Sequence, residues 1–255
     1  MTPPIDLGRT RSVSQLLDAT FSLWWRYRAV FFTLSLIIVA PVAIISEGIL
    51  QDFGDISNRD DVSINDVSPL FLVMVLTLIQ IPLVTASFAC AVERMGAGEE
   101  VGVGDALRGG IAVFVSALLA ILLAGLLTAL GFVALILPGI YLSVRLAFVG
   151  QAAAIERTGA RAALRMSMRL TKGRFWSVLG ILALVSFGGF VVATAVQAPF
   201  HAMGGTAELA AAALVQSAVN SVTALALTLV YFDLRVRAEP EPAAPVAVDA
   251  ASEGW

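Results

Sequence analysis

The apolar residues of this chain fall into long uncharged runs that are separated by short polar segments. A helix rises 1.5 Å per residue and the hydrocarbon layer of a bilayer is about 30 Å thick, so about 20 apolar residues are enough to cross it. The runs predict six membrane-spanning helices, at about residues 29–50, 69–92, 111–136, 139–155, 175–198 and 208–232. The third and fourth come from one run that is too long for a single crossing, and Pro138-Gly139 is its best turn signal.

Composition agrees with this pattern. Hydrophobic residues make up 58% of the 255 residues and charged residues only 14%, whereas an average soluble domain has about 45–50% and about 25%. A single cysteine, Cys90, argues against a disulfide-stapled secreted fold, and a net charge of −3 argues against a basic nucleic-acid-binding domain. We therefore predict an all-α, polytopic integral membrane protein with no nucleic-acid partner.

The positions of the basic residues predict the orientation of the helices, because lysine and arginine collect in short cytoplasmic loops. Fourteen of the 16 basic residues lie in four segments: before the first run, after the second, after the fourth and after the last. The two exceptions are Arg59 and Arg145. These segments share one side of the membrane, so both termini are expected to be cytoplasmic. Lys172 is the only lysine, and the excess of arginine with abundant alanine, valine and glycine is typical of GC-rich bacteria. The bacterial plasma membrane is the expected location.

The segments on either side of the six-helix domain, residues 29–237, have distinct compositions. Residues 1–11 form an N-terminal extension. Residues 12–28 show apolar positions at helical spacing, with Ser12 and Gln15 placed as a capping box and tryptophans near the end, which predicts an amphipathic helix in the membrane interface. Residues 238–255 combine prolines with acidic residues and are predicted to be a disordered acidic tail.

A stripe of basic residues follows the fourth run. Its members recur every three or four residues and therefore share one face of a predicted central amphipathic helix, and a further arginine follows them: Arg157, Arg161, Arg165, Arg169, Lys172 and then Arg174. Such clusters attract anionic lipids of the inner leaflet by about 1 kcal/mol per residue. The alternative is that the stripe receives an acidic partner protein or a phosphorylated ligand.

Several polar residues fall at membrane depth. Arg145, Gln80 and Asn220 are each near the middle of a predicted span, Gln216 lies on the polar face of the sixth, and Asp233 is the nearest carboxylate towards the cytoplasmic end, with Glu47 nearest at the other. A charge inside a bilayer is costly and calls for a partner or a water-filled cavity. Two hypotheses follow: polar contacts that hold helices together, or a substrate pathway centred on Arg145.

Small residues at helical spacing predict close packing of the third span. Ala117, Ala120, Ala124 and Thr128 recur at three- or four-residue intervals along it. Residues of this size let helix backbones approach one another in a membrane.

Motifs for catalysis are missing. His201 is the only histidine, which excludes a two-histidine zinc site, and the sequence contains neither a G-x-S-x-G elbow nor a P-loop. We therefore expect no enzymatic activity, no metal and no cofactor.

Three ordered motifs, at residues 137–146, 165–176 and 231–237, together with the amphipathic opening, resemble the bacterial membrane domain that occurs beside glycerophosphoryl diester phosphodiesterases. The resemblance covers nearly the whole chain and implies a six-helix integral membrane domain. The resemblance also implies that, in the phosphodiesterase members, catalysis belongs to a separate soluble barrel with histidine and acidic residues. This chain has neither the length nor the histidines for such a barrel, so the resemblance implies no activity.

Two functions are expected from these features. The first is a non-catalytic scaffold or accessory factor for membrane or envelope lipid processes, which contacts a membrane-protein partner or a second copy of itself. The alternative is a transporter or channel for a small anionic or lipid-like substrate, with its site around Arg145.

Overall fold

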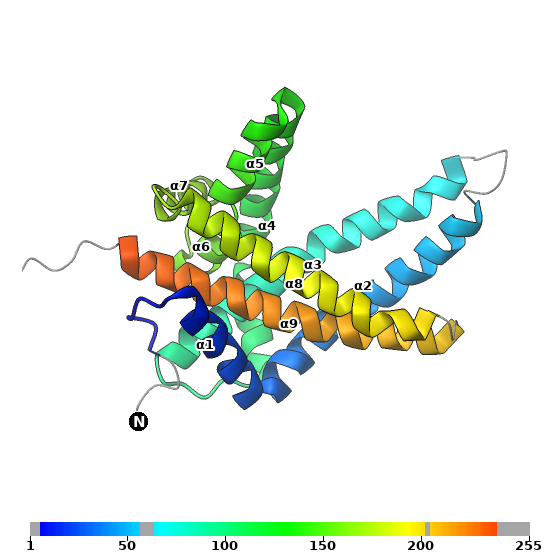
Figure 1. The fold of residues 1–255 in the computed structure, drawn as a ribbon, viewed down its shortest axis with the longest axis horizontal. Helices are drawn as coiled ribbons and strands as arrows, with labels where there is room; N and C mark the ends of the chain where they lie inside the picture. Colours follow the sequence, from blue (N-terminus) through cyan, green and yellow to red (C-terminus); the bar gives the residue numbers. More distant parts are fainter. Residues whose placement is uncertain (1–5, 57–63, 202–204, 239–255) are drawn as a thin grey trace, which may run out of the picture.

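A computed structural model describes residues 6–56, 64–201 and 205–238, and every regular element within these ranges is a helix (Figure 1). The predicted tail after Ala238, the first five residues and parts of two loops lie outside the described residues. The helices in chain order are α1 Val13–Arg26, α2 Arg28–Ile56, α3 Ile64–Gly96, α4 Val103–Ala134, α5 Ile136–Arg145, α6 Val149–Glu156, α7 Ala160–Leu170, α8 Phe175–His201 and α9 Gly205–Ala238.

Six segments of the described chain are long and apolar enough to cross a membrane, which confirms the predicted number. They are Arg28–Ile49, Ser68–Gly96, Val103–Ala134, Ile136–Glu156, Phe175–Phe200 and Gly205–Ala238. The chain is therefore a multi-pass membrane protein by the length and composition of its helices.

The fourth span differs from the prediction, because it is two helices rather than one. The chain leaves α4 through an extended residue, Leu135, and Pro138 lies in the first turn of α5, where a missing N–H needs no partner. A second break follows Arg145. There the hydroxyl of Ser167 on α7 donates to the carbonyl of Arg145 at 2.9 Å and accepts from the backbone N–H of Phe148 at 3.3 Å. One side chain thus replaces hydrogen bonds that a continuous helix would make.

Helix α1 begins as predicted. The hydroxyl of Ser12 accepts from the backbone N–H of Gln15 at 3.3 Å, and the Gln15 amide oxygen accepts from the backbone N–H of Ser12 at 3.1 Å, which completes a capping box. On its inner face, Trp24 donates from its indole N–H to the hydroxyl of Ser221 on α9 at 2.7 Å. Helix α1 is therefore docked on α9, while several of its apolar side chains, such as Phe21, remain exposed.

The spans form three hairpins. In Figure 1 the α4–α5 hairpin (green) diverges from the α2–α3 hairpin (blue to cyan) and from the α8–α9 hairpin (yellow to orange). We call the region where α3 and α9 end and α4 begins the basic end, because Arg94, Arg108 and Arg235 lie there. Much of the apolar core lies towards this end, where the rings of Phe31 and Phe88 stack with centroids 5.5 Å apart.

Close packing of α4 is confirmed. Ala117, Ala120 and Ala124 are all buried, Thr128 is half-buried, and Gly110 lies directly against α3. A Cβ atom at Gly110 would lie 2.8 Å from the Cα atom of Ser87, closer than real Cβ contacts. The absence of a side chain at this position therefore sets the distance between α3 and α4.

Candidate functional site

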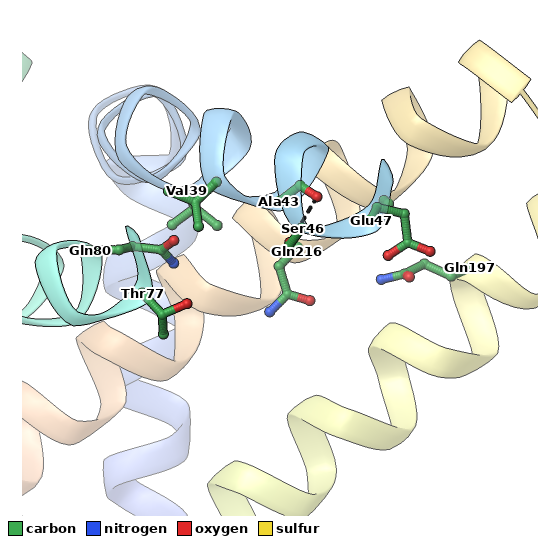
Figure 2. Close-up of a pocket in the computed structure, with 10 residues that line it drawn as sticks. Val39, Ala43, Ser46, Glu47, Thr77, Gln80, Gln197 and Gln216 are labelled. Carbon is green, nitrogen blue, oxygen red and sulfur yellow. Dashed lines mark hydrogen bonds between the residues drawn. The ribbon is translucent and has the colours of Figure 1, made fainter. Parts of the chain in front are cut away.

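A polar pocket of about 180 Å³ lies between α2, α3, α8 and α9, in the half of the bundle away from the basic end (Figure 2). Four apolar residues of α2 and α9 complete its wall. Its polar lining consists of one carboxylate, three amides and two hydroxyls, from Glu47, Gln80, Gln197, Gln216, Ser46 and Thr77. We call this the polar pocket.

All six polar side chains of the polar pocket are half-buried. The carboxylate of Glu47 and the amide of Gln197 point toward one another in Figure 2. The hydroxyl of Ser46 donates to the carbonyl of Ala43 at 3.0 Å, and that of Thr77 donates to the carbonyl of Val73 at 2.8 Å. Since both hydroxyl protons are used within their own helices, these oxygens are left to act as acceptors.

Prolines lie within the helices beside the polar pocket. Pro41 lies inside α2, Pro82 inside α3 and Pro199 inside α8, each within two residues of a residue that lines the pocket. A proline has no N–H, so each removes one bond of the helix ladder and leaves the carbonyl four residues earlier without its helical partner. The sequence therefore places a proline near the level of the pocket on three of its four helices.

This arrangement is suited to a cation. Carboxylate, amide and hydroxyl oxygens are the donors that hard cations and ammonium groups prefer. None of the described residues that line the polar pocket is basic. A ligand with a positive charge would therefore meet only Glu47 as a charged group.

The structure brings together two of the five residues of the predicted intramembrane cluster, Gln80 and Gln216. Asn220 lies half-buried one turn from Gln216 on α9. Arg145 lies elsewhere, at the end of α5, where its guanidinium is 5.7 Å from the centroid of the Tyr141 ring. The pathway centred on Arg145 therefore has no counterpart in the lining of this pocket.

Asp233 is also separate from the polar pocket, because it lies near the end of α9. Its carboxylate accepts from the backbone N–H of Arg11 at 2.6 Å and from Nε of Arg237 at 2.6 Å. Asp233 is buried, so these two bonds satisfy a carboxylate that would be costly to leave unpaired. Its role is to hold the segment before α1 against α9.

The basic stripe is shorter than predicted. Helix α7 carries Arg161, Arg165 and Arg169, all exposed, while its opposite face is buried through Ala163, Leu164, Ser167 and Leu170. Arg157 precedes the helix, and Lys172 and Arg174 follow its end. A turn after α6 thus removes Arg157 from the stripe, although the sequence spacing continues through it.

A cluster of charges at the basic end was not predicted. Glu156 accepts from the hydroxyl of Tyr231 at 3.0 Å and pairs with Nη1 of Arg235 at 3.3 Å, while Nη2 of Arg157 lies 4.0 Å from Oε2 of Glu93. These residues come from α3, α9 and the region around the end of α6, so no local sequence pattern links them. Glu47 and Gln197 were missed as site residues for the same reason; the signal for Glu47 was a lone carboxylate within an apolar run.

Comparison with known proteins identifies a family over more than half of the chain. Residues 101–236 match the family described as "Domain of unknown function (DUF7847)". The chain belongs to this family. The DUF7847 region runs from just before α4 almost to the end of α9, so it contains Gln197 and Gln216 of the polar pocket, whereas Glu47 and Gln80 precede it.

No curated protein and no solved structure matches the chain. The description of the DUF7847 family states no function. The resemblance to the phosphodiesterase-associated membrane domain stays a prediction, and the functional argument rests on the geometry of the site.

Proposed function

We propose that this protein binds a small cationic solute in the polar pocket and serves as a membrane binding or transport protein. The observation that carries the proposal is the convergence of Glu47, three glutamine amides and two hydroxyls from four helices on one pocket. Polar groups at membrane depth are costly and typically line a substrate or ion pathway. The expected substrate changes from an anion at Arg145 to a cation at Glu47, because the charge in the pocket is negative.

The apolar core between the polar pocket and the basic end is closely packed. This supports access of a solute to the pocket from one side only. Phe31, Leu34, Phe88 and Leu225 are completely buried in the parts of α2, α3 and α9 that lead from the pocket to the basic end. A solute therefore enters from the opposite end. Under the positive-inside rule the basic end is cytoplasmic, so we place the entrance on the outer face of the bacterial plasma membrane.

Binding, rather than catalysis, is the role that the polar pocket supports. A nucleophile needs an adjacent base, but the hydroxyl of Ser46 donates to a backbone carbonyl and that of Thr77 does the same. We therefore retain a non-enzymatic function. A scaffold role draws on no comparable feature of the structure, so the polar pocket carries the proposal.

The proposal is tested by cation binding to the purified protein in detergent. Sodium chloride and methylammonium chloride are titrated at constant ionic strength against choline chloride, and the apparent Tm is followed. We expect a saturable rise in Tm for at least one of the two small cations. Glu47→Gln should weaken its binding by about tenfold or more, because a charged partner contributes about 1.5–3 kcal/mol.

Glu100→Gln is the matched control, since Glu100 is exposed near the basic end and does not line the polar pocket. It should bind the cation as the unmodified protein does. Equal binding by the Glu47→Gln variant, or no response to either cation, would overturn the proposal.

A further inference from the structure

A second pocket, of about 420 Å³, opens near the basic end between the last turns of α3 and residues 109–116 of α4. Its charged lining consists of Glu93, Arg94 and Arg157, and Ala112 and Val113 of α4 form part of its apolar wall. Small-molecule sites typically measure about 300–1,000 Å³, so the volume fits a discrete ligand. We call this the interface pocket, because it lies where two membrane-spanning segments end.

Glu93 has an unused acceptor beside the interface pocket. Its Oε2 atom is buried and has no hydrogen-bond partner among the described residues. Nη2 of Arg157 is 4.0 Å from this atom, which is too far for a hydrogen bond. A buried acceptor without a donor is costly, so a ligand that donates to Oε2 would relieve that cost.

Arg157 is held in an unusual conformation above Glu93. Its φ angle is +49°, and no other non-glycine residue among the described residues has a positive φ. A left-handed residue after a helix is usually glycine, so an arginine here works against the backbone preference. Its side chain is 71% exposed, which leaves the guanidinium accessible to a ligand beside the carboxylate.

The charges around the interface pocket are balanced rather than uniformly positive. Arg94 is paired with Glu99 at 2.6 Å, and Arg157 faces Glu93. A purely anionic ligand would meet the Glu93 carboxylate, and a purely cationic ligand would meet the Arg157 guanidinium. A ligand with one negative and one positive group is complementary to both.

The surroundings of the interface pocket indicate where such a ligand comes from. Ile111 and Val115, on either side of Ala112 along α4, are 58% and 64% exposed, as expected for side chains that face lipid tails. The charged residues of the pocket, Glu93, Arg94 and Arg157, lie close to the ends of the apolar segments Ser68–Gly96 and Ile136–Glu156. Gly109 adds no side chain between the two helices, and a Cβ there would lie 3.1 Å from the Cβ of Cys90.

We propose that the interface pocket binds the head of an ethanolamine phospholipid, with the phosphate on Arg157 and the ammonium on Oε2 of Glu93. Two carbon atoms separate the phosphate from the ammonium in this head, so one molecule reaches both side chains. The ammonium donates to the acceptor that the protein leaves unused. The acyl chains follow the apolar surface of α4 beside Ile111 and Val115.

Single-chain lipids test this assignment on the purified full-length protein in detergent. Lysophosphatidylethanolamine is compared with lysophosphatidylcholine, whose ammonium has no N–H, and with lysophosphatidylglycerol, which has no ammonium. The apparent Tm is followed during each titration. We expect lysophosphatidylethanolamine to bind about tenfold more tightly than the other two, as one charge-assisted hydrogen bond predicts.

Variants separate the two halves of the head. Glu93→Gln should abolish the preference for ethanolamine over choline, and Arg157→Gln should weaken all three lipids. Arg161→Gln is the matched control, because Arg161 is exposed on α7 and does not line this pocket. The Tm of each variant without lipid reports whether its fold is intact.

Three results would overturn the proposal. The first is equal or tighter binding of lysophosphatidylglycerol, which would indicate a site for anionic lipid. The second is an unchanged ethanolamine preference in a folded Glu93→Gln variant. The third is equally tight binding of free phosphoethanolamine, which would show that the lipid tail contributes nothing.

Discussion

Replacing Gly110 with alanine tests how closely α4 packs on α3. The new Cβ would lie 2.8 Å from both the Cα and the backbone nitrogen of Ser87. Carbon atoms are at their optimum separation at about 3.5–4.0 Å, so α4 would have to move away by about 1 Å. Overpacking of this kind costs about 1–3 kcal/mol.

Gly125→Ala is the matched control on the same helix. A Cβ at Gly125 has no atom within 4 Å, so this variant receives the gain in helix propensity without a clash. The two variants should therefore differ by the cost of overpacking. In a chain of this size, 1 kcal/mol corresponds to about 2–4 °C, so the Tm of Gly110→Ala should be about 2–12 °C below that of Gly125→Ala.

Thermal unfolding of both proteins in the same detergent, followed by tryptophan fluorescence, measures this difference. Equal Tm values would show that α3 and α4 do not approach at Ser87, and the packing of the third span would have to be revised.

Two further predictions concern Arg157, which follows α6, and Asp233, which lies near the end of α9. Arg157→Gly should be about 1 kcal/mol more stable than Arg157→Ala in thermal unfolding, because both lose the guanidinium but only glycine accepts a φ of +49° without strain; equal stabilities would contradict the left-handed conformation. Asp233→Asn should speed tryptic cleavage at Arg9 and Arg11 several-fold in proteoliposomes, because the charged acceptor that holds the backbone of Arg11 is weakened. Asp105→Asn, at the start of α4, is its control, and the same acceleration there would refute the specific role of Asp233.

The six spans were predictable from the sequence because the thickness of a bilayer imposes a length on each apolar run. The capping box of α1 was predictable for a similar reason, since Ser12 and Gln15 are three residues apart and act within one turn. The buried alanines of α4 follow from helical spacing. In each case the information lies within a single element.

The break after Arg145 was not predictable, because residues 146–149 are all apolar and include neither proline nor glycine. The bonds that make it tolerable come from Ser167, on a different helix. Depth was likewise insufficient to assign the site. Arg145 and Gln80 were both predicted near the middle of a span, yet only Gln80 lines the polar pocket. The reason is that the α4–α5 hairpin diverges from the other two hairpins (Figure 1).

The central claim, a hydrated pocket within the membrane-spanning bundle, is tested most directly by the reactivity of an introduced cysteine. Gln80→Cys and Leu78→Cys are made in a Cys90→Ala background and treated in proteoliposomes with a membrane-impermeant, cationic thiosulfonate. Leu78 is an exposed residue two positions from Gln80 that does not line the polar pocket.

Thiolates react in water and not in hydrocarbon, so the cysteine at position 80 should react at least about tenfold faster than that at position 78. Reagent added to the face opposite the basic end should account for this reaction. Equal rates at the two positions, or reaction at position 80 only from the basic end, would contradict the account.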